Sequence, residues 1–342
     1  MKVLVTGGYF DDSCEGFLDE VNLVNGSTRR RFSHTPEASL RVPTKGFTGS
    51  VRLEEATLLV CSFNAVHRID LARGVETGRL TQPDFNDLHS VGFDAQTGQI
   101  HVCNTGLDAV EVFDTAGRFL GRHATSPAWF ERERLEGGAV ERQRYPELLA
   151  TGWGHATAAV PRVMPAGTYY QHAQATAFQQ SIVRDYLHPN HVVAVDGRLA
   201  VTLLASREVR CLRTHQCLVR TAGHPHDGQV EGDRFWTTTT NGTVTAWDRR
   251  SGPPWTATEQ YDVFATGITG WCRGLLVRDD CLVVGLTEMR SPPQYPWSDR
   301  PLGQTSTSLV VLERGSGRLL HHVRIPQPER HPKVFSIQAA DA

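Results

Sequence analysis

Three histidines open similar short phrases in widely separated parts of the chain. The phrases are His89-Ser-Val-Gly-Phe-Asp, His191-Val-Val-Ala-Val-Asp and His226-Asp-Gly-Gln-Val-Glu. A neutral imidazole is the commonest metal ligand in proteins, and its ordinary pKa of about 6.5 leaves it neutral at pH 7. Three such ligands hold one divalent ion and leave a position for water or substrate, as catalytic sites do. The pattern therefore predicts a metal site built from His89, His191 and His226.

A fourth phrase, Arg273-Gly-Leu-Leu-Val-Arg-Asp, has arginine where the others have histidine. A guanidinium is always charged and can hold a carboxylate at two points. Neutral imidazoles leave the charge of a metal uncompensated, so we expect a small anionic substrate that bears a carboxylate. Three nitrogen ligands do not select one metal: zinc is the first choice, and iron, copper and manganese also fit.

Four further residues are candidates for roles around this site. His188 and His224 lie just before two of the predicted ligands. We expect them to replace a ligand, orient one, or transfer protons. Glu288, after a strand-like run, and Tyr170 are candidates for acid or base work.

The phrases belong to repeated units of β-strands. Each is followed by β-branched or aromatic runs of strand length, and short turns separate the runs. The second strands of five units are expected at 57–62, 100–105, 199–204, 235–240 and 282–287, and the third strands at 66–70, 110–114, 209–212, 244–248 and 309–313. Equivalent positions converge when such units surround an axis, which would bring the histidines and Arg273 together.

The two ends of the chain supply a sixth unit. The run 334–338 is expected to pair beside 2–6, with 17–23 continuing the same sheet, so that the ring closes and no sheet edge is left exposed. We therefore predict an all-β, six-bladed β-propeller, with residues 1–342 as a single domain.

Two segments interrupt the repeats. Residues 121–187 contain a charged stretch compatible with a helix and then irregular sequence, and we expect a partly helical insertion that folds over the histidines as a lid. The shorter segment 291–301 is too rich in proline for regular structure.

Composition limits the class of protein. The 342 residues are 39% hydrophobic with a formal charge of -2, which predicts a packed globular protein and gives no indication of nucleic-acid binding. The short apolar run at the start is neither a signal peptide nor a membrane span, so we expect a cytosolic protein without a membrane partner. Seven cysteines, none in a Cys-x-x-Cys pair, fit reduced thiols.

With its repeated phrases, the chain resembles the six-bladed propellers of the NHL-repeat and gluconolactonase-like group. The histidine pattern is similar in plan to the site of the peptidyl-hydroxyglycine amidating lyase. That resemblance implies a catalytic zinc on the axis, with His89, His191 and His226 as ligands, Arg273 as the anion clamp and Tyr170 as a base. The long insertion and the missing secretory context depart from that lyase, and gluconolactonase-like enzymes use mainly carboxylate and amide ligands.

Three functions follow from these features. The leading hypothesis is a metal-dependent lyase or hydrolase acting on a small carboxylate-bearing molecule. An iron- or copper-dependent oxygenase on the same three histidines is the second. The third is a propeller scaffold without catalysis, which binds a partner protein on one face.

The metal hypothesis makes a direct prediction for His191→Ala. If three imidazoles share one ion, this variant should lose its metal while keeping its fold, because a ligand on the axis contributes little to packing between blades. Metal analysis of the purified proteins measures the effect. Unchanged metal content in the variant would remove His191 from the ligand set.

Overall fold

The structure is a computed structural model. It describes residues 1–38, 41–42, 44–82, 85–125, 153–154, 187–290, 300 and 302–341. Within these residues no helix is long and apolar enough to cross a membrane.

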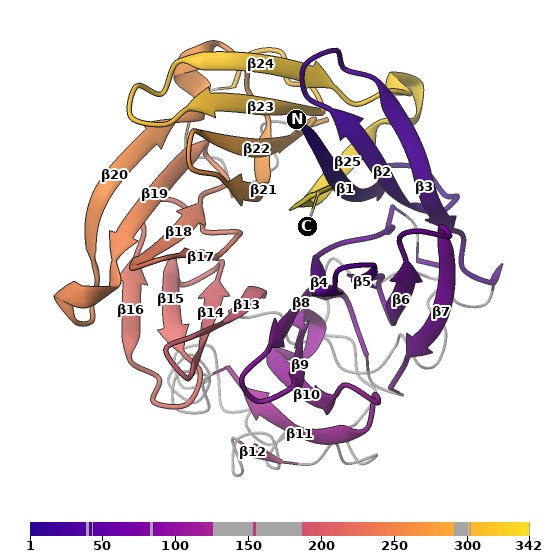
Figure 1. The fold of residues 1–342 in the computed structure, drawn as a ribbon, viewed down its shortest axis with the longest axis vertical. Coiled ribbons are helices and arrows are strands. Elements are labelled where there is room, and N and C mark those ends of the chain that lie inside the picture. The colour runs from indigo at the N-terminus through magenta and orange to yellow at the C-terminus, as the bar shows by residue number, and fades with distance from the viewer. Residues whose placement is uncertain are drawn as a thin grey trace, which may run out of the picture.

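Six antiparallel sheets surround a common axis, and the predicted six-bladed β-propeller is confirmed (Figure 1). In each blade the first strand below lies nearest the axis. Blade one contains β25 (Pro332–Ala339), β1 (Lys2–Tyr9), β2 (Gly16–Asn22) and β3 (Thr28–His34); blade two contains β4 (Ser50–Glu54), β5 (Thr57–Cys61), β6 (Val66–Asp70) and β7 (Val75–Leu80); blade three contains β8 (Leu88–Asp94), β9 (Gln99–Asn104), β10 (Ala109–Asp114), β11 (Phe119–Ala124) and β12 (Trp153–Gly154). Blade four contains β13 (Pro189–Val195), β14 (Arg198–Leu203), β15 (Glu208–Cys211) and β16 (Cys217–Arg220); blade five contains β17 (Gln229–Glu231), β18 (Arg234–Thr238), β19 (Thr243–Asp248) and β20 (Thr256–Asp262); blade six contains β21 (Trp271–Val277), β22 (Cys281–Thr287), β23 (Ser308–Glu313) and β24 (Leu319–Arg324). The described helical turns are η2 (Thr105–Leu107), η3 (Arg249–Ser251), η4 (Val263–Thr266) and η6 (Pro328–Arg330).

Burial along the strands follows their place in a blade. The second strand β22 is buried at all its positions, whereas the outer strand β7 alternates between exposed and half-buried residues. A strand covered on both faces needs a continuous apolar run, and an outer strand does not. This difference explains why the apolar runs of the sequence mark second and third strands more clearly than outer ones.

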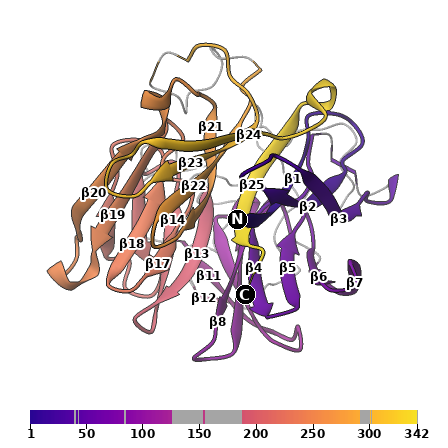
Figure 2. The ribbon, with the colours of Figure 1, turned by 45° about the horizontal axis from the view of Figure 1, so that its top comes forward.

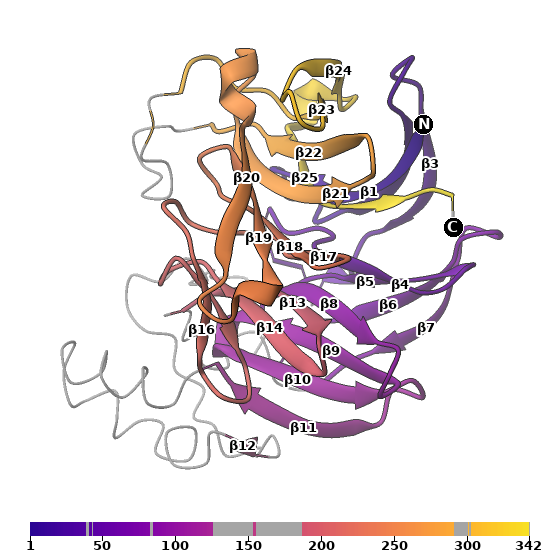
Figure 3. The ribbon, with the colours of Figure 1, turned by 60° about the vertical axis from the view of Figure 1, so that its left-hand side comes forward.

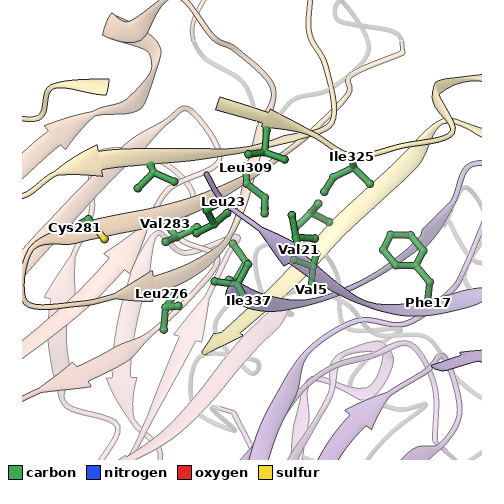
Figure 4. Close-up of a cluster of buried hydrophobic side chains, with 14 of the residues drawn as sticks. Val5, Phe17, Val21, Leu23, Leu276, Cys281, Val283, Leu309, Ile325 and Ile337 are labelled. Carbon is green, nitrogen blue, oxygen red and sulfur yellow. The ribbon is translucent and has the colours of Figure 1, made fainter. Parts of the chain in front are cut away.

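The first blade is built from both ends of the chain. β25 pairs antiparallel with β1, and β1 pairs with β2, so the last strand lies nearest the axis in the sheet that begins the chain (Figures 1 and 2). A cluster of buried side chains from β1, β2, β21, β22 and β23 packs across the boundary between blades six and one (Figure 4). Pairing and packing together close the ring.

The inner strands of neighbouring blades lie side by side near the axis. β8 and β13 are an example, visible from the side in Figure 3. The predicted insertion 121–187 begins inside β11, and nearly all of its remaining residues, like those of 291–301, lie outside the described ones. The predicted lid therefore stays a prediction.

Closure of the ring can be tested by comparing two valines. Val334 on β25 is 0% exposed, and Val24 in the turn after β2 is 64% exposed. We expect Val334→Ala to lower the free energy of unfolding by about 2 kcal/mol, because two buried carbons are lost and a cavity remains. Val24→Ala should change it by less than about 0.5 kcal/mol. Chemical denaturation measures both, and equal effects would contradict a role of β25 in closing the fold.

Candidate axial site

A cavity of about 260 Å³ lies on the axis, lined by residues of all six inner strands, β4, β8, β13, β17, β21 and β25, and of the loop before β17. The three histidines of the repeated phrases, His89, His191 and His226, all line it. The prediction that these residues approach the axis from separate blades therefore agrees with the structure. The cavity is below the usual size for drug-like ligands, about 300–1,000 Å³, which favours a small molecule.

Phe335 on β25 lines this cavity together with His89 and His226, and it is also the centre of a wider group of polar side chains. Its ring centroid lies 5.9 Å from that of His89 and 6.1 Å from that of His226. The guanidinium carbon of Arg273 lies 4.5 Å from the same centroid, and Lys333 Nζ lies 6.0 Å from it. We call His89, His188, His226, Arg273, Lys333 and Phe335 the axial cluster.

The histidines of two phrases do not share one register, which corrects the expectation from sequence. In β8, Leu88 pairs with Asn104 and Ser90 with Cys103, so His89 is the extra residue of a β-bulge. In β13, Pro189 and His191 are the paired residues and Asn190 is the extra one. His191 therefore corresponds to Ser90, not to His89. A shift of one residue turns a strand side chain to the other face.

The position of His191 is used for contact between blades. At the corresponding position of β8, Ser90 Oγ accepts a hydrogen bond from the backbone N–H of Val192 in blade four. The ring of His191 lies against Gly228 of blade five, where an added Cβ would be 3.2 Å from its Cδ2. His191 therefore takes part in packing between blades, which the sequence did not predict.

His89 is held by residues that precede it. Its Nδ1 donates to the carbonyl of Asp87 over 3.1 Å, and the carboxylate of Asp87 lies 3.7 Å from the same nitrogen. Lys45 Nζ forms an ion pair with Asp87 at 2.7 Å. Burial lowers the pKa of His89 well below its usual value, against the opposing effect of Asp87. The ring is therefore neutral at pH 7, with its lone pair on Nε2.

His226 has a carboxylate partner in the next residue. Its Nδ1 lies 3.5 Å from Asp227 Oδ1, and Thr238 Oγ1 donates to Asp227 Oδ2. Burial lowers the pKa of His226, while Asp227 acts in the opposite direction. A neutral histidine oriented by a carboxylate can accept a proton from a bound molecule.

Arg273 lies between two aromatic rings. Its guanidinium carbon is 3.8 Å from the ring centroid of Trp271 and 4.5 Å from that of Phe335, and the residue is 8% exposed. Lys333 is nearby and buried, and its pKa is lowered well below the usual value by burial and by the charges of Lys45 and Arg273. Arg273 is therefore the permanent positive charge of the axial cluster, and burial disfavours the protonated form of Lys333 beside it.

The remaining predicted residues have different surroundings. His188 belongs to the axial cluster, because its ring meets that of His89 edge to face at 4.7 Å. His224 is held away from it by Leu204 and Arg207, whose backbone oxygen and guanidinium lie 2.9 and 3.2 Å from its ring nitrogens. Glu288 accepts a hydrogen bond from His331 at 3.0 Å. Tyr170 lies outside the described residues.

The histidines do not fit a shared metal ion in the arrangement observed. Among the described residues, one group brings three His, Cys, Asp or Glu ligand atoms within 4.8 Å of one another, and it contains none of the axial histidines. Neither His89, His191 and His226, nor the same set with His188 in place of His191, forms such a group. Ligands about 2.1 Å from one ion must lie closer together than that limit.

The sequence did not point to several residues of the site. Asp227 directly follows His226, and that adjacency was a usable signal for a histidine with a carboxylate partner. Lys333 and Phe335 lie in a run recognised only as a closing strand, although that strand is the innermost one of its blade. Asp87 and Lys45 precede inner strands and carried no signal.

Comparisons with known proteins agree with this geometry at the level of fold. No protein-family model matches the sequence, and no curated protein matches it. The fold is similar to a solved structure of a protein of unknown function from Bacteroides caccae, with a TM-score of 0.60 and 11% identity over 98% of this chain and 97% of that one. It is also similar to a chain in a nidogen/laminin complex, with a TM-score of 0.55 and 10% identity over 98% and 97% of the two chains. The chain is a six-bladed β-propeller, and at these identities the likeness shows the fold alone.

Burial of neutral histidines predicts loss of stability in acid. The pKa of His226 is lower in the folded chain than its unfolded value of about 6.5. Below that pH the unfolded chain binds a proton that the folded chain does not, so stability falls by up to about 1.4 kcal/mol per pH unit for each such residue. We expect His226→Gln to reduce this slope between pH 6.5 and 5. Urea denaturation at several pH values measures it, and an unchanged slope would contradict the assigned environment.

Proposed function

We propose that the protein is an enzyme that binds a small carboxylate-bearing molecule at the axial cluster and transfers a proton by way of a histidine. The observation that carries the proposal is the convergence of His89, His226, Arg273 and Lys333, from different blades, around Phe335. Such a convergence of polar groups beside a cavity is typical of ligand sites.

The balance of charge favours an anion. The carboxylate of Asp87 is engaged by Lys45, and that of Asp227 by Thr238 and His226. Arg273 contacts the faces of the Trp271 and Phe335 rings, and Lys333 is buried near it. A carboxylate between these two side chains would pair with Arg273 and favour the protonated form of Lys333, because charges interact strongly where water is excluded.

The histidines supply the proposed chemistry. The Nε2 atoms of His89 and His226 can accept a proton at neutral pH, since burial keeps both rings neutral. Asp227 would stabilise the imidazolium formed on His226. Proton removal beside a held carboxylate is the first step of many lyase reactions, and activation of water by the same nitrogen is the equivalent step in hydrolysis. The oxygenase alternative requires the shared ion, which the histidines do not fit as arranged.

Arg273→Gln tests the proposal. We expect wild-type protein to bind small carboxylates from a panel of mono- and dicarboxylic acids in isothermal titration calorimetry. The variant should bind the same compound about 10- to 100-fold more weakly, as expected for loss of a charge-assisted hydrogen bond.

The matched control is Arg300→Gln. Arg300 is paired with Asp262 at 2.8 Å and does not line the axial cavity, so this variant should bind as wild type does. His226→Gln should retain binding but lose conversion of the bound acid, followed by proton NMR. Equal affinity in Arg273→Gln, or equal binding of the matching neutral amides, would contradict the proposal.

A further inference from the structure

Two further histidines, His34 and His67, lie toward the outer edges of blades one and two, away from the axis. His34 ends β3 of blade one, while His67 on β6 and Glu76 on β7 belong to blade two. β3 and β7 are the outer strands of these blades (Figure 1). A cavity of about 490 Å³ opens here and is lined by His34, His67 and Arg79, among others.

We propose that His34, His67 and Glu76 form a binding site for one divalent transition-metal ion of the zinc type. One ligand atom from each lies within 4.8 Å of the others. His67 Nδ1 is 3.0 Å from Glu76 Oε1, and the two imidazole centroids are 4.7 Å apart. Two ligands bound tetrahedrally at about 2.1 Å from zinc lie about 3.4 Å apart, so small adjustments would seat an ion. Two histidines and a carboxylate would leave a fourth position to water from the cavity.

The hydrogen bonds of His67 present the correct nitrogen. In the tautomer of His67 that is protonated on Nε2, Ser62 Oγ accepts from this nitrogen over 3.0 Å and donates to the carbonyl of Ala65 over 3.3 Å. The lone pair of a neutral His67 is then on Nδ1, which faces Glu76 Oε1, itself an acceptor. Two acceptors 3.0 Å apart need a proton or a cation between them. A hydrogen-bonded second nitrogen is also the usual arrangement of metal-binding histidines.

His34 completes the set from the neighbouring blade. Its ring is stacked on Phe47 with an interplanar angle of 8°, which fixes its plane. In the described part of the chain neither of its ring nitrogens takes part in a hydrogen bond that would compete for an ion.

Arg79 would compete with a metal ion for the carboxylate of Glu76. Its Nε and Nη2 donate to the two oxygens of Glu76, each over 2.7 Å. A carboxylate can accept from several partners, but the positive guanidinium repels a nearby cation. Removal of Arg79 should therefore strengthen metal binding. If His67, Glu76 and Arg79 only stabilise the fold through their hydrogen bonds, removal of Arg79 would weaken that network without any gain in metal affinity.

Zinc titration of the metal-free full chain tests the site. We expect isothermal titration calorimetry to give one equivalent of bound Zn²⁺. His34→Gln and Glu76→Gln should each weaken binding at least about 10-fold, and Arg79→Gln should strengthen it several-fold. Circular dichroism would show that each variant is folded. His34 is half-buried at a strand end, so its replacement leaves the fold intact even if a change at His67 does not.

Two controls separate this site from other histidines. His322→Gln, at an exposed position of β24, and His226→Gln in the axial cluster should both bind zinc as wild type does. The proposal is overturned if no zinc binds, if His34→Gln binds as tightly as wild type, or if Arg79→Gln fails to bind more tightly. Loss of binding in His226→Gln alone would assign the ion to the axis and would also overturn it.

Discussion

Antiparallel pairing between β1 and β25 holds the first and last strands of the chain in one sheet, and both the ring and the axial cluster depend on it. The pairing contains a bulge at Phe335, which lies between the paired residues Val334 and Ser336. Gly7 lies opposite this irregularity, where an added Cβ would be only 1.9 Å from the carbonyl oxygen of Lys333. The two glycines after the first apolar run therefore allow close approach of neighbouring backbones.

Much of the fold was predictable because its strands carry strong local signals. The runs that begin at Thr57, Ile100 and Leu282 fall on β5, β9 and β22, which must be apolar because blades cover both of their faces. Outer strands such as β3, with its run of arginines, carry little signal because one face meets water. Five blades could be predicted from the repeats, and the sixth from the strand-like runs at the two ends of the chain.

The site was predictable only in part. That histidines from several blades reach the axis followed from the repeated phrases. Which of them share a position did not follow, because a bulge adds one residue to a strand without any mark in the sequence. His89 occupies the bulge and His191 follows it, so phrases that look aligned place their rings in different surroundings. Phe335 was not predicted as a site residue because it is apolar, and the sequence pattern was searched for polar and charged residues.

Histidines have two different environments in this molecule, the axial cluster and the site at His67, and the neighbouring charges distinguish the two. Near Phe335 the histidines lie with Arg273 and Lys333, and the two nearby carboxylates are held by other partners. At the rim, His67 faces a carboxylate directly. Imidazoles accompanied by cations favour an anionic partner, whereas imidazoles that face a carboxylate favour a cation.

Because β25 pairs with β1 although the two strands are far apart in the sequence, the ring cannot close until both strands have been synthesised. Five blades can form from residues already made, but the sheet that contains β1 lacks its innermost strand until residues 332–339 have left the ribosome. Phe335 and Lys333 arrive with that strand. The axial cluster is therefore completed only after β25 has been synthesised, and a chain that stops before β25 would lack both an edge partner for β1 and the aromatic centre of the cluster.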